Sequence, residues 1–307
     1  MSFQFNILID DIFLALNTTD GLAPIDRKHV LSIANGFEDG KWRFSNFQSF
    51  IWDNIAETAL SQRERESLVN RSQSQLIAAA KNLRLTDKTE DIGKGSELAE
   101  IVLYGVMKNH YSALPVVPKI FYKQNPQDNA KGADSVHIVL EGTDEFSLWF
   151  GEAKFYNSIE DARLGAVIDS IRNALDTDKL KKENTIIANV QDIDRLVQDT
   201  SLRDKIKSAI GSRNSIDDIA TKIHVPILLI HECQITCSAS TFDDAYKNAI
   251  IEFHKDRANV YFKSQISKLN SIHKYPKISF HLILLPVPNK KVIVDKFISN
   301  VEHYKEQ

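Results

Sequence analysis

The chain has 307 residues, 43% of them hydrophobic and 26% charged, which is ordinary for a folded globular protein and long enough for one elaborated domain or two. The formal net charge of −3 argues against a strong overall attraction to nucleic acid, but it leaves room for a local basic groove. Two cysteines are too few for disulfides to stabilise a chain of this size. No apolar run is long enough for a membrane span, and the start MSFQFNILIDD lacks the basic region of a signal peptide. We therefore expect a cytoplasmic protein with no membrane contact.

Residues 1–90 are expected to form a mainly helical N-terminal subdomain, and residues 91–307 a separate core. The first residues alternate in a strand-like way, and Asp26 is placed to cap a helix that runs through Ile33 and ends at Asn35-Gly36. Apolar residues recur at helical spacing in 44–60 and again in 61–84. This region contains no catalytic constellation.

The segment from residue 96 to residue 107 predicts a helix capped by Ser96, with Glu97 and Glu100 near its start. A carboxylate in the first turn of a helix is stabilised by the macrodipole, which is a sufficient structural reason for either glutamate. The two residues are three apart and lie on nearly the same face of the helix, so either is also placed to reach a site beside it.

The stretch from Lys131 to Lys154, KGADSVHIVLEGTDEFSLWFGEAK, contains the main functional pattern. Asp134 precedes one strand-like run, and a second such run ends in Gly151-Glu152-Ala153-Lys154. Side chains alternate along a strand, so Glu152 and Lys154 share a face, and pairing of the two runs as a hairpin would bring Asp134 beside them. Charged groups at the end of an apolar strand cost desolvation energy that core packing does not explain.

This arrangement suits phosphodiester hydrolysis. Asp134 and Glu152 are expected to hold Mg²⁺, with Mn²⁺ as an alternative, because Mg²⁺ usually takes one or two protein carboxylates and completes its shell with water and phosphate. The ion lowers the pKa of bound water and neutralises charge on the phosphate. A lysine in the place of Lys154 orients the attacking water and stabilises the developing charge.

The rest of the chain predicts a mixed α/β core. Residues 115–124 are expected to form its first strand, and after Lys154 the order is helix, strand, helix, strand and helix. Lys123, Lys131 and Arg163 are either solvated surface residues or contacts to the nucleic-acid backbone.

The spacing D-x(17)-E-x-K resembles the PD-(D/E)xK nuclease superfamily, although Ala133 stands where the superfamily usually has proline. The ordered motifs SELAEIVLY, KGADSVH and GEAKFY make the chain similar to the nuclease subunit of Hachiman-type anti-phage defence systems, and to related two-gene nuclease–helicase systems that block phage replication. The resemblance implies a restriction-endonuclease-like fold, DNA as substrate and a superfamily 2 helicase as partner and restraint. It assigns the catalytic residues to Asp134, Glu152 and Lys154, with Glu97 as the preceding helical glutamate, and it leaves open which kind of system this is.

Three other interpretations remain. His231, Cys233 and Cys237 have a spacing that could suggest zinc, although they lie in or just after an apolar strand. The chain could be a catalytically inactive nuclease-fold module that docks a helicase onto DNA. Glu152 and Lys154 could also form a surface ion pair on an edge strand, which would contribute only about 0–1 kcal/mol. The sequence has no G-x(4)-G-K-[ST] loop, so any ATP hydrolysis is expected from a partner.

Overall fold

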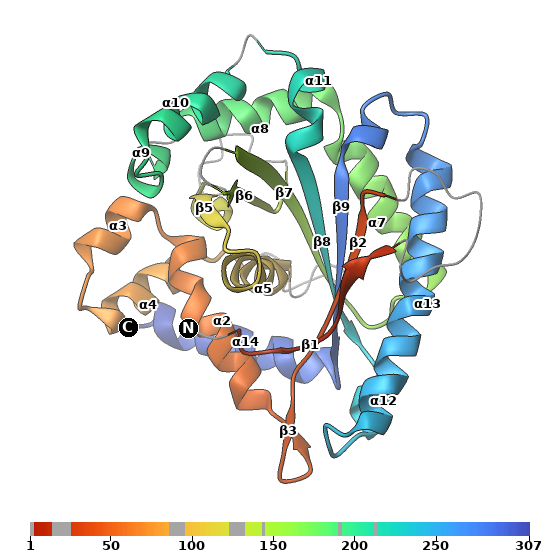
Figure 1. Cartoon of the computed structure of the whole chain (residues 1–307). Coiled ribbons are helices and arrows are strands. Elements are labelled where there is room, and N and C mark those ends of the chain that lie inside the picture. The colour runs from red at the N-terminus through yellow and green to blue at the C-terminus, as the bar shows by residue number, and fades with distance from the viewer. Residues whose placement is uncertain are drawn as a thin grey trace.

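A seven-stranded sheet forms the centre of the computed structural model, which describes residues 3–13, 26–85, 96–122, 133–142, 145–189, 192–211 and 214–307 (Figure 1). The strand order is β1-β2-β9-β8-β7-β6-β5. The strands are β1 (Asn6–Ile12), β2 (Lys28–Ala34), β5 (Leu114–Val117), β6 (Ser135–Glu141), β7 (Glu145–Tyr156), β8 (Ile223–Glu232) and β9 (Ser279–Val287). Strands β2, β9, β8 and β7 run parallel, whereas β1, β6 and β5 are antiparallel to their neighbours.

Helices cover both faces of the sheet (Figure 1). One apolar layer packs under α7 (Asp161–Ala174), α8 (Thr177–Asn189), α10 (Thr200–Ala209) and α13 (Asp244–Leu269). The opposite layer packs under α2 (Phe44–Ala59), α4 (Ser72–Asn82), α5 (Ser96–Asn109) and α14 (Lys290–Lys305). This mixed sheet flanked by helices confirms the predicted restriction-endonuclease-like α/β fold.

The N-terminal part contributes strands as well as helices. The predicted helix from Asp26 to Ile33 is wrong, because residues 28–34 form β2 and pair with β9 from Lys28↔Phe280 to Ser32↔Leu284. Nearly every residue of β2 is buried, and a short apolar run buried on both faces cannot be told from a buried helix by periodicity alone. The division of the chain at residue 90 stays a prediction.

The predicted strand at 115–124 is correct only at its start. Strand β5 ends at Val117, and the short helix α6 (Lys119–Tyr122) follows Pro118. Proline has no N–H to donate to a strand ladder, and its fixed φ suits the beginning of a helix. The strands and the long helix predicted after residue 223 are confirmed as β8, α13 and β9.

Shorter elements complete the described chain. They are β3 (Phe37–Glu38), β4 (Lys41–Trp42), α3 (Gln62–Ser67), α9 (Asp192–Leu196), α11 (Ile216–Ile219), η2 (Ala220–Lys222), α12 (Gln234–Ser238) and η3 (Tyr275–Lys277). Within the described ranges, no helix is both long and apolar enough to cross a membrane.

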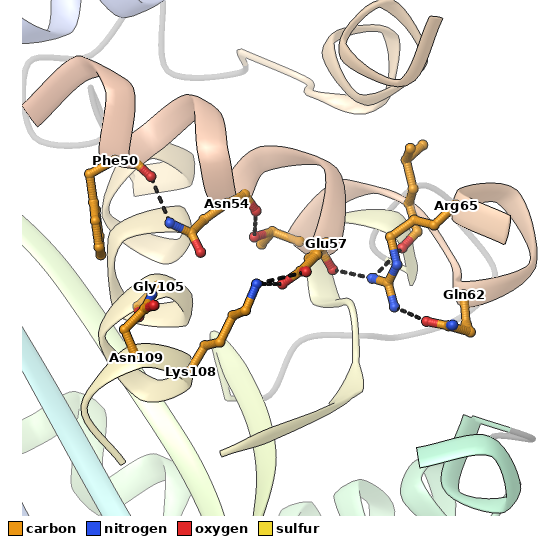
Figure 2. Close-up of polar contacts among 10 residues, drawn as sticks. Phe50, Asn54, Glu57, Gln62, Arg65, Gly105, Lys108 and Asn109 are labelled. Atoms are coloured by element: carbon orange, nitrogen blue, oxygen red, sulfur yellow. Dashed lines mark hydrogen bonds and ion pairs between the residues drawn. The ribbon is translucent and has the colours of Figure 1, made fainter. Parts of the chain in front are cut away.

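Helices α2 and α5 approach each other closely at Gly105 (Figure 2). A Cβ atom at Gly105 would lie 2.5 Å from Cζ of Phe50 and 2.8 Å from Nδ2 of Asn54. One turn further along, the Lys108 ammonium lies 2.8 Å from both carboxylate oxygens of Glu57. This ion pair joins α5 to α2, and on the sheet side of α5 the Leu103 side chain covers Gly151 of β7.

Candidate active site

The candidate site lies where β6 separates from β7. The two strands pair from Glu141↔Glu145 to Ser135↔Gly151, and β7 then continues alone on that side to Tyr156 while it stays paired with β8. The Asp134 N–H donates to the Gly151 carbonyl at 2.7 Å, so Asp134 is still held against β7. Its Oδ2 accepts the Ala153 N–H at 3.1 Å. Backbone contacts on both sides of Glu152 therefore fix Asp134 beside it.

The strand alternation places Glu152 and Lys154 on one face. It is the face of Phe150 and Tyr156, which point into the layer under α7 and α13. Ala153 points the other way, into the layer under α5. The Lys154 Nζ lies 2.7 Å from Oε1 of Glu152 and 3.6 Å from Oδ2 of Asp134. The structure thus brings together the three residues that the sequence singled out, and their catalytic role stays a prediction.

The charges of the cluster depend on one another. Burial acts to lower the pKa of Lys154, but the Asp134 and Glu152 carboxylates outweigh it and raise the pKa above its ordinary value. Lys154 is therefore an ammonium group at neutral pH. The exposed fraction is 31% for the Lys154 side chain, 17% for Asp134 and 8% for Glu152, so the cluster is open to solvent on the Lys154 side.

Ser170 is a site residue whose role the sequence did not reveal. Its hydroxyl donates from α7 to Oε1 of Glu152 at 2.6 Å, and the Lys154 ammonium forms its ion pair with the same oxygen. Within the described part of the chain, Oε2 of Glu152 has no hydrogen bond, so it is the oxygen open to a further contact. The available signal was a hydroxyl among the apolar residues on the buried side of a predicted helix.

Glu97 has a structural contact that the sequence did not indicate. Its two carboxylate oxygens accept the N–H groups of Arg84 and Leu85, each at 2.8 Å, which fastens the chain after α4 to the start of α5. Glu100 lies in the same helix and is buried, with an exposed fraction of 4%. Helix α5 packs against the face of β7 opposite to Glu152. A part for either glutamate in a metal site stays a prediction.

Of the three predicted backbone-contact residues, Lys123 and Lys131 lie outside the described residues. Arg163 is exposed on α7, and its guanidinium carbon lies 5.7 Å from the centroid of the Tyr156 ring. Tyr156 follows Lys154 on the same face of β7, and burial raises the pKa of its hydroxyl while Lys154 acts to lower it. Arg163 therefore places a second positive charge near the cluster, on the side of Tyr156.

The donor groups at the site fit a magnesium-type ion. Asp134 and Glu152 supply two carboxylates, which matches an ion that keeps several water ligands. Across the described residues, no group of three or more His, Cys, Asp and Glu side chains is arranged to hold a metal. His231, considered for zinc, has other partners: its Nε2 lies 3.0 Å from Nε2 of His254, and its Nδ1 lies 3.3 Å from the Glu232 carbonyl.

Comparison with known families gives the wider context. The HamA family model matches residues 10–301, which is nearly the whole chain. The chain belongs to the HamA family. HamA-family proteins are associated with Hachiman anti-phage defence, so this chain is a component of a multi-gene defence system and the resemblance noted in the sequence is confirmed. A search of curated proteins found no match.

Proposed function

We propose that this HamA-family chain is a metal-dependent DNA nuclease that hydrolyses phosphodiester bonds as the effector of its defence system. The observation that carries the proposal is the gathering of Asp134, Glu152 and Lys154 at an open strand edge of a restriction-endonuclease-like sheet. Ionised groups held so close together cost desolvation energy, and a fold that needed them only for packing would be more stable with apolar residues there.

Asp134 and Glu152 would hold Mg²⁺ or Mn²⁺, and a bound ion would supply a water of lowered pKa and neutralise charge on the scissile phosphate. The chain's own residues prepare the site. The Ala153 N–H fixes Oδ2 of Asp134, and Ser170 fixes Oε1 of Glu152. The Lys154 ammonium is placed to orient the attacking water and to stabilise the charge that develops on the phosphate.

We further propose that the substrate is DNA in the cytoplasm and that a superfamily 2 helicase encoded alongside is the partner that restrains the nuclease. Arg163 beside the cluster, with Lys123 and Lys131, would contact backbone phosphates. The sequence has no phosphate-binding loop of the G-x(4)-G-K-[ST] type, which fits a system in which the partner hydrolyses ATP.

The first test is cleavage of supercoiled and linear DNA by the purified chain in Mg²⁺ or EDTA, beside Glu152→Gln and Lys154→Met. Both substitutions keep the side-chain size, and each should reduce cleavage by about 100-fold or more, since each removes a charge from the site. Glu252→Gln, at an exposed glutamate paired with Lys255, is the matched control and should cleave normally. Full cleavage by Glu152→Gln would overturn the assignment.

An inactive purified chain would lead to the same assay with the helicase and ATP, because an effector that works in a complex can also need its partner for activity. Continued absence of cleavage there would support the alternative function, a catalytically inactive module that docks the helicase onto DNA.

A further inference from the structure

A buried ion pair lies beside the candidate site. The Lys119 Nζ of α6 lies 2.6 Å from Oε2 of Glu183 on α8, and the two side chains are only 2% and 6% exposed. Two buried charges are tolerated when further hydrogen bonds satisfy them, and removing one partner alone is strongly destabilising. The remaining contacts of Glu183 therefore indicate what this pair does in the fold.

The second oxygen of Glu183 holds the backbone next to Asp134. Its Oε1 accepts the N–H of Ala133 at 3.1 Å, and the following N–H, that of Asp134, donates to the Gly151 carbonyl at 2.7 Å. Two consecutive backbone groups are thus held from different sides, one by α8 and one by β7. A hydrogen bond to a carboxylate is stronger than one between neutral groups, so the contact to α8 is a firm one.

Ala133 has the N–H that this contact requires. Proline, the usual residue at this position in the superfamily that the chain resembles, has no N–H and could not donate to Glu183. The contact between the Ala133 N–H and the buried Glu183 carboxylate therefore requires a residue other than proline at position 133.

We propose that Glu183 is a positioning residue for Asp134. By holding the Ala133 N–H, it fixes the backbone from which the Asp134 carboxylate projects towards Glu152 and Lys154, and Lys119 keeps the Glu183 carboxylate in place. A metal site needs its ligands within about 0.5 Å of the productive geometry, and the partners that orient metal ligands typically change metal affinity by about 10–100-fold. The inference rests on the proposed function, because it assumes that Asp134 binds the metal.

The test separates the hydrogen bond to Ala133 from the ion pair. Lys119→Met/Glu183→Gln and Lys119→Met/Glu183→Met both remove the two buried charges, so neither leaves an unpaired ion. Glutamine keeps an oxygen that accepts the Ala133 N–H, whereas methionine has a similar shape without that oxygen. The readouts are Mn²⁺ affinity by calorimetry and the urea unfolding midpoint.

We expect the glutamine variant to bind Mn²⁺ within about twofold of the unsubstituted chain and the methionine variant to bind at least about tenfold more weakly. Equal affinities in the two variants, whether both unchanged or both reduced, would overturn the role of Glu183. Asp134→Asn distinguishes a failure of the proposed metal site from a failure of the positioning role of Glu183. If Asp134→Asn binds Mn²⁺ as well as the unsubstituted chain does, the proposed metal site is wrong rather than the positioning role alone.

Hydrogen exchange in the unsubstituted chain keeps the inference testable if the methionine variant does not fold. The Ala133 amide should be protected to a similar degree as the Asp134 amide, because both donate to fixed acceptors. Exchange of the Ala133 amide at the rate of an unstructured chain would contradict the proposal.

Discussion

At the scale of single residues, Glu152 depends on the groups that share its Oε1. A carboxylate that is only 8% exposed needs hydrogen bonds, and Lys154 and Ser170 supply them to the same oxygen. The Lys154 ammonium neutralises the charge of Glu152. The Ser170 hydroxyl fixes the orientation of the carboxylate, because it donates from a fixed position on α7. Ser170 therefore determines the orientation of the Glu152 carboxylate as much as β7 does.

Ser170→Ala tests this dependence. Loss of the hydrogen bond to a charged group should lower the free energy of unfolding by about 1–2 kcal/mol. It should also reduce metal-dependent cleavage about tenfold, because Glu152 loses its orienting partner. Urea unfolding and the plasmid assay measure the two effects. Ser170→Thr keeps the hydroxyl and is expected to retain most of the cleavage. Wild-type cleavage by Ser170→Ala would show that Ser170 does not orient Glu152.

At the scale of elements, the sequence predicts strands and site residues where a simple periodicity governs them. Alternation in 145–156 predicts that Glu152 and Lys154 share a face, and the hairpin with residues 135–140 predicts that Asp134 lies beside them. The same reasoning fails for β2, because burial on both faces erases the alternation. It also gives no role to Glu183, since the polar segment KLKKEN is typical of a solvated helix and only the tertiary fold buries its glutamate.

The close packing of α5 against α2 is another feature at this scale, and the sequence alone did not predict it. Gly105→Ala should lower the free energy of unfolding by about 1–3 kcal/mol, because the new Cβ would meet the Phe50 ring at 2.5 Å. This cost opposes the roughly 1 kcal/mol that alanine gains over glycine inside a helix. Gly165→Ala in α7 is the matched control, since its Cβ would meet only Lys268 Nζ at 3.6 Å. Equal stabilities of the two variants, measured by urea unfolding, would contradict the close approach of α2 and α5.

At the scale of the whole molecule, a buried chain of hydrogen bonds joins distant parts of the sequence. Ser32 of β2 lies 2.6 Å from Nδ1 of His254 on α13, and Nε2 of His254 lies 3.0 Å from Nε2 of His231 on β8. The Nδ1 of His231 donates to the Glu232 carbonyl, so its Nε2 is an acceptor. His254 then donates from Nε2 and accepts the Ser32 hydroxyl at Nδ1. Burial disfavours a positive charge on either ring, and protonation of both rings would set the two Nε2 donors against each other.

The buried hydrogen bonds of Ser32, His254 and His231 lead us to predict that acid destabilises the fold. Burial lowers the pKa of His231 to about 4, and burial together with His231 lowers the pKa of His254 well below its ordinary value. The unfolded chain has histidine pKa values near 6.5, so above that pH both states are neutral and this stabilisation is fully present. As the pH falls from about 6.5 towards 4, the unfolded state takes up protons first and the stabilisation is lost.

Urea unfolding at pH 7.5, 6 and 5 should therefore show a free energy of unfolding that falls steadily below pH 6.5. His231→Gln/His254→Gln removes both titrating groups, so it should be less stable at pH 7.5 but should show a shallower decline towards pH 5. Exposed His273 provides the control, since His273→Gln leaves the buried chain intact and should keep the wild-type slope. A wild-type free energy of unfolding that is constant from pH 7.5 to pH 5 would contradict neutral, buried His231 and His254 as a link between β2, α13 and β8.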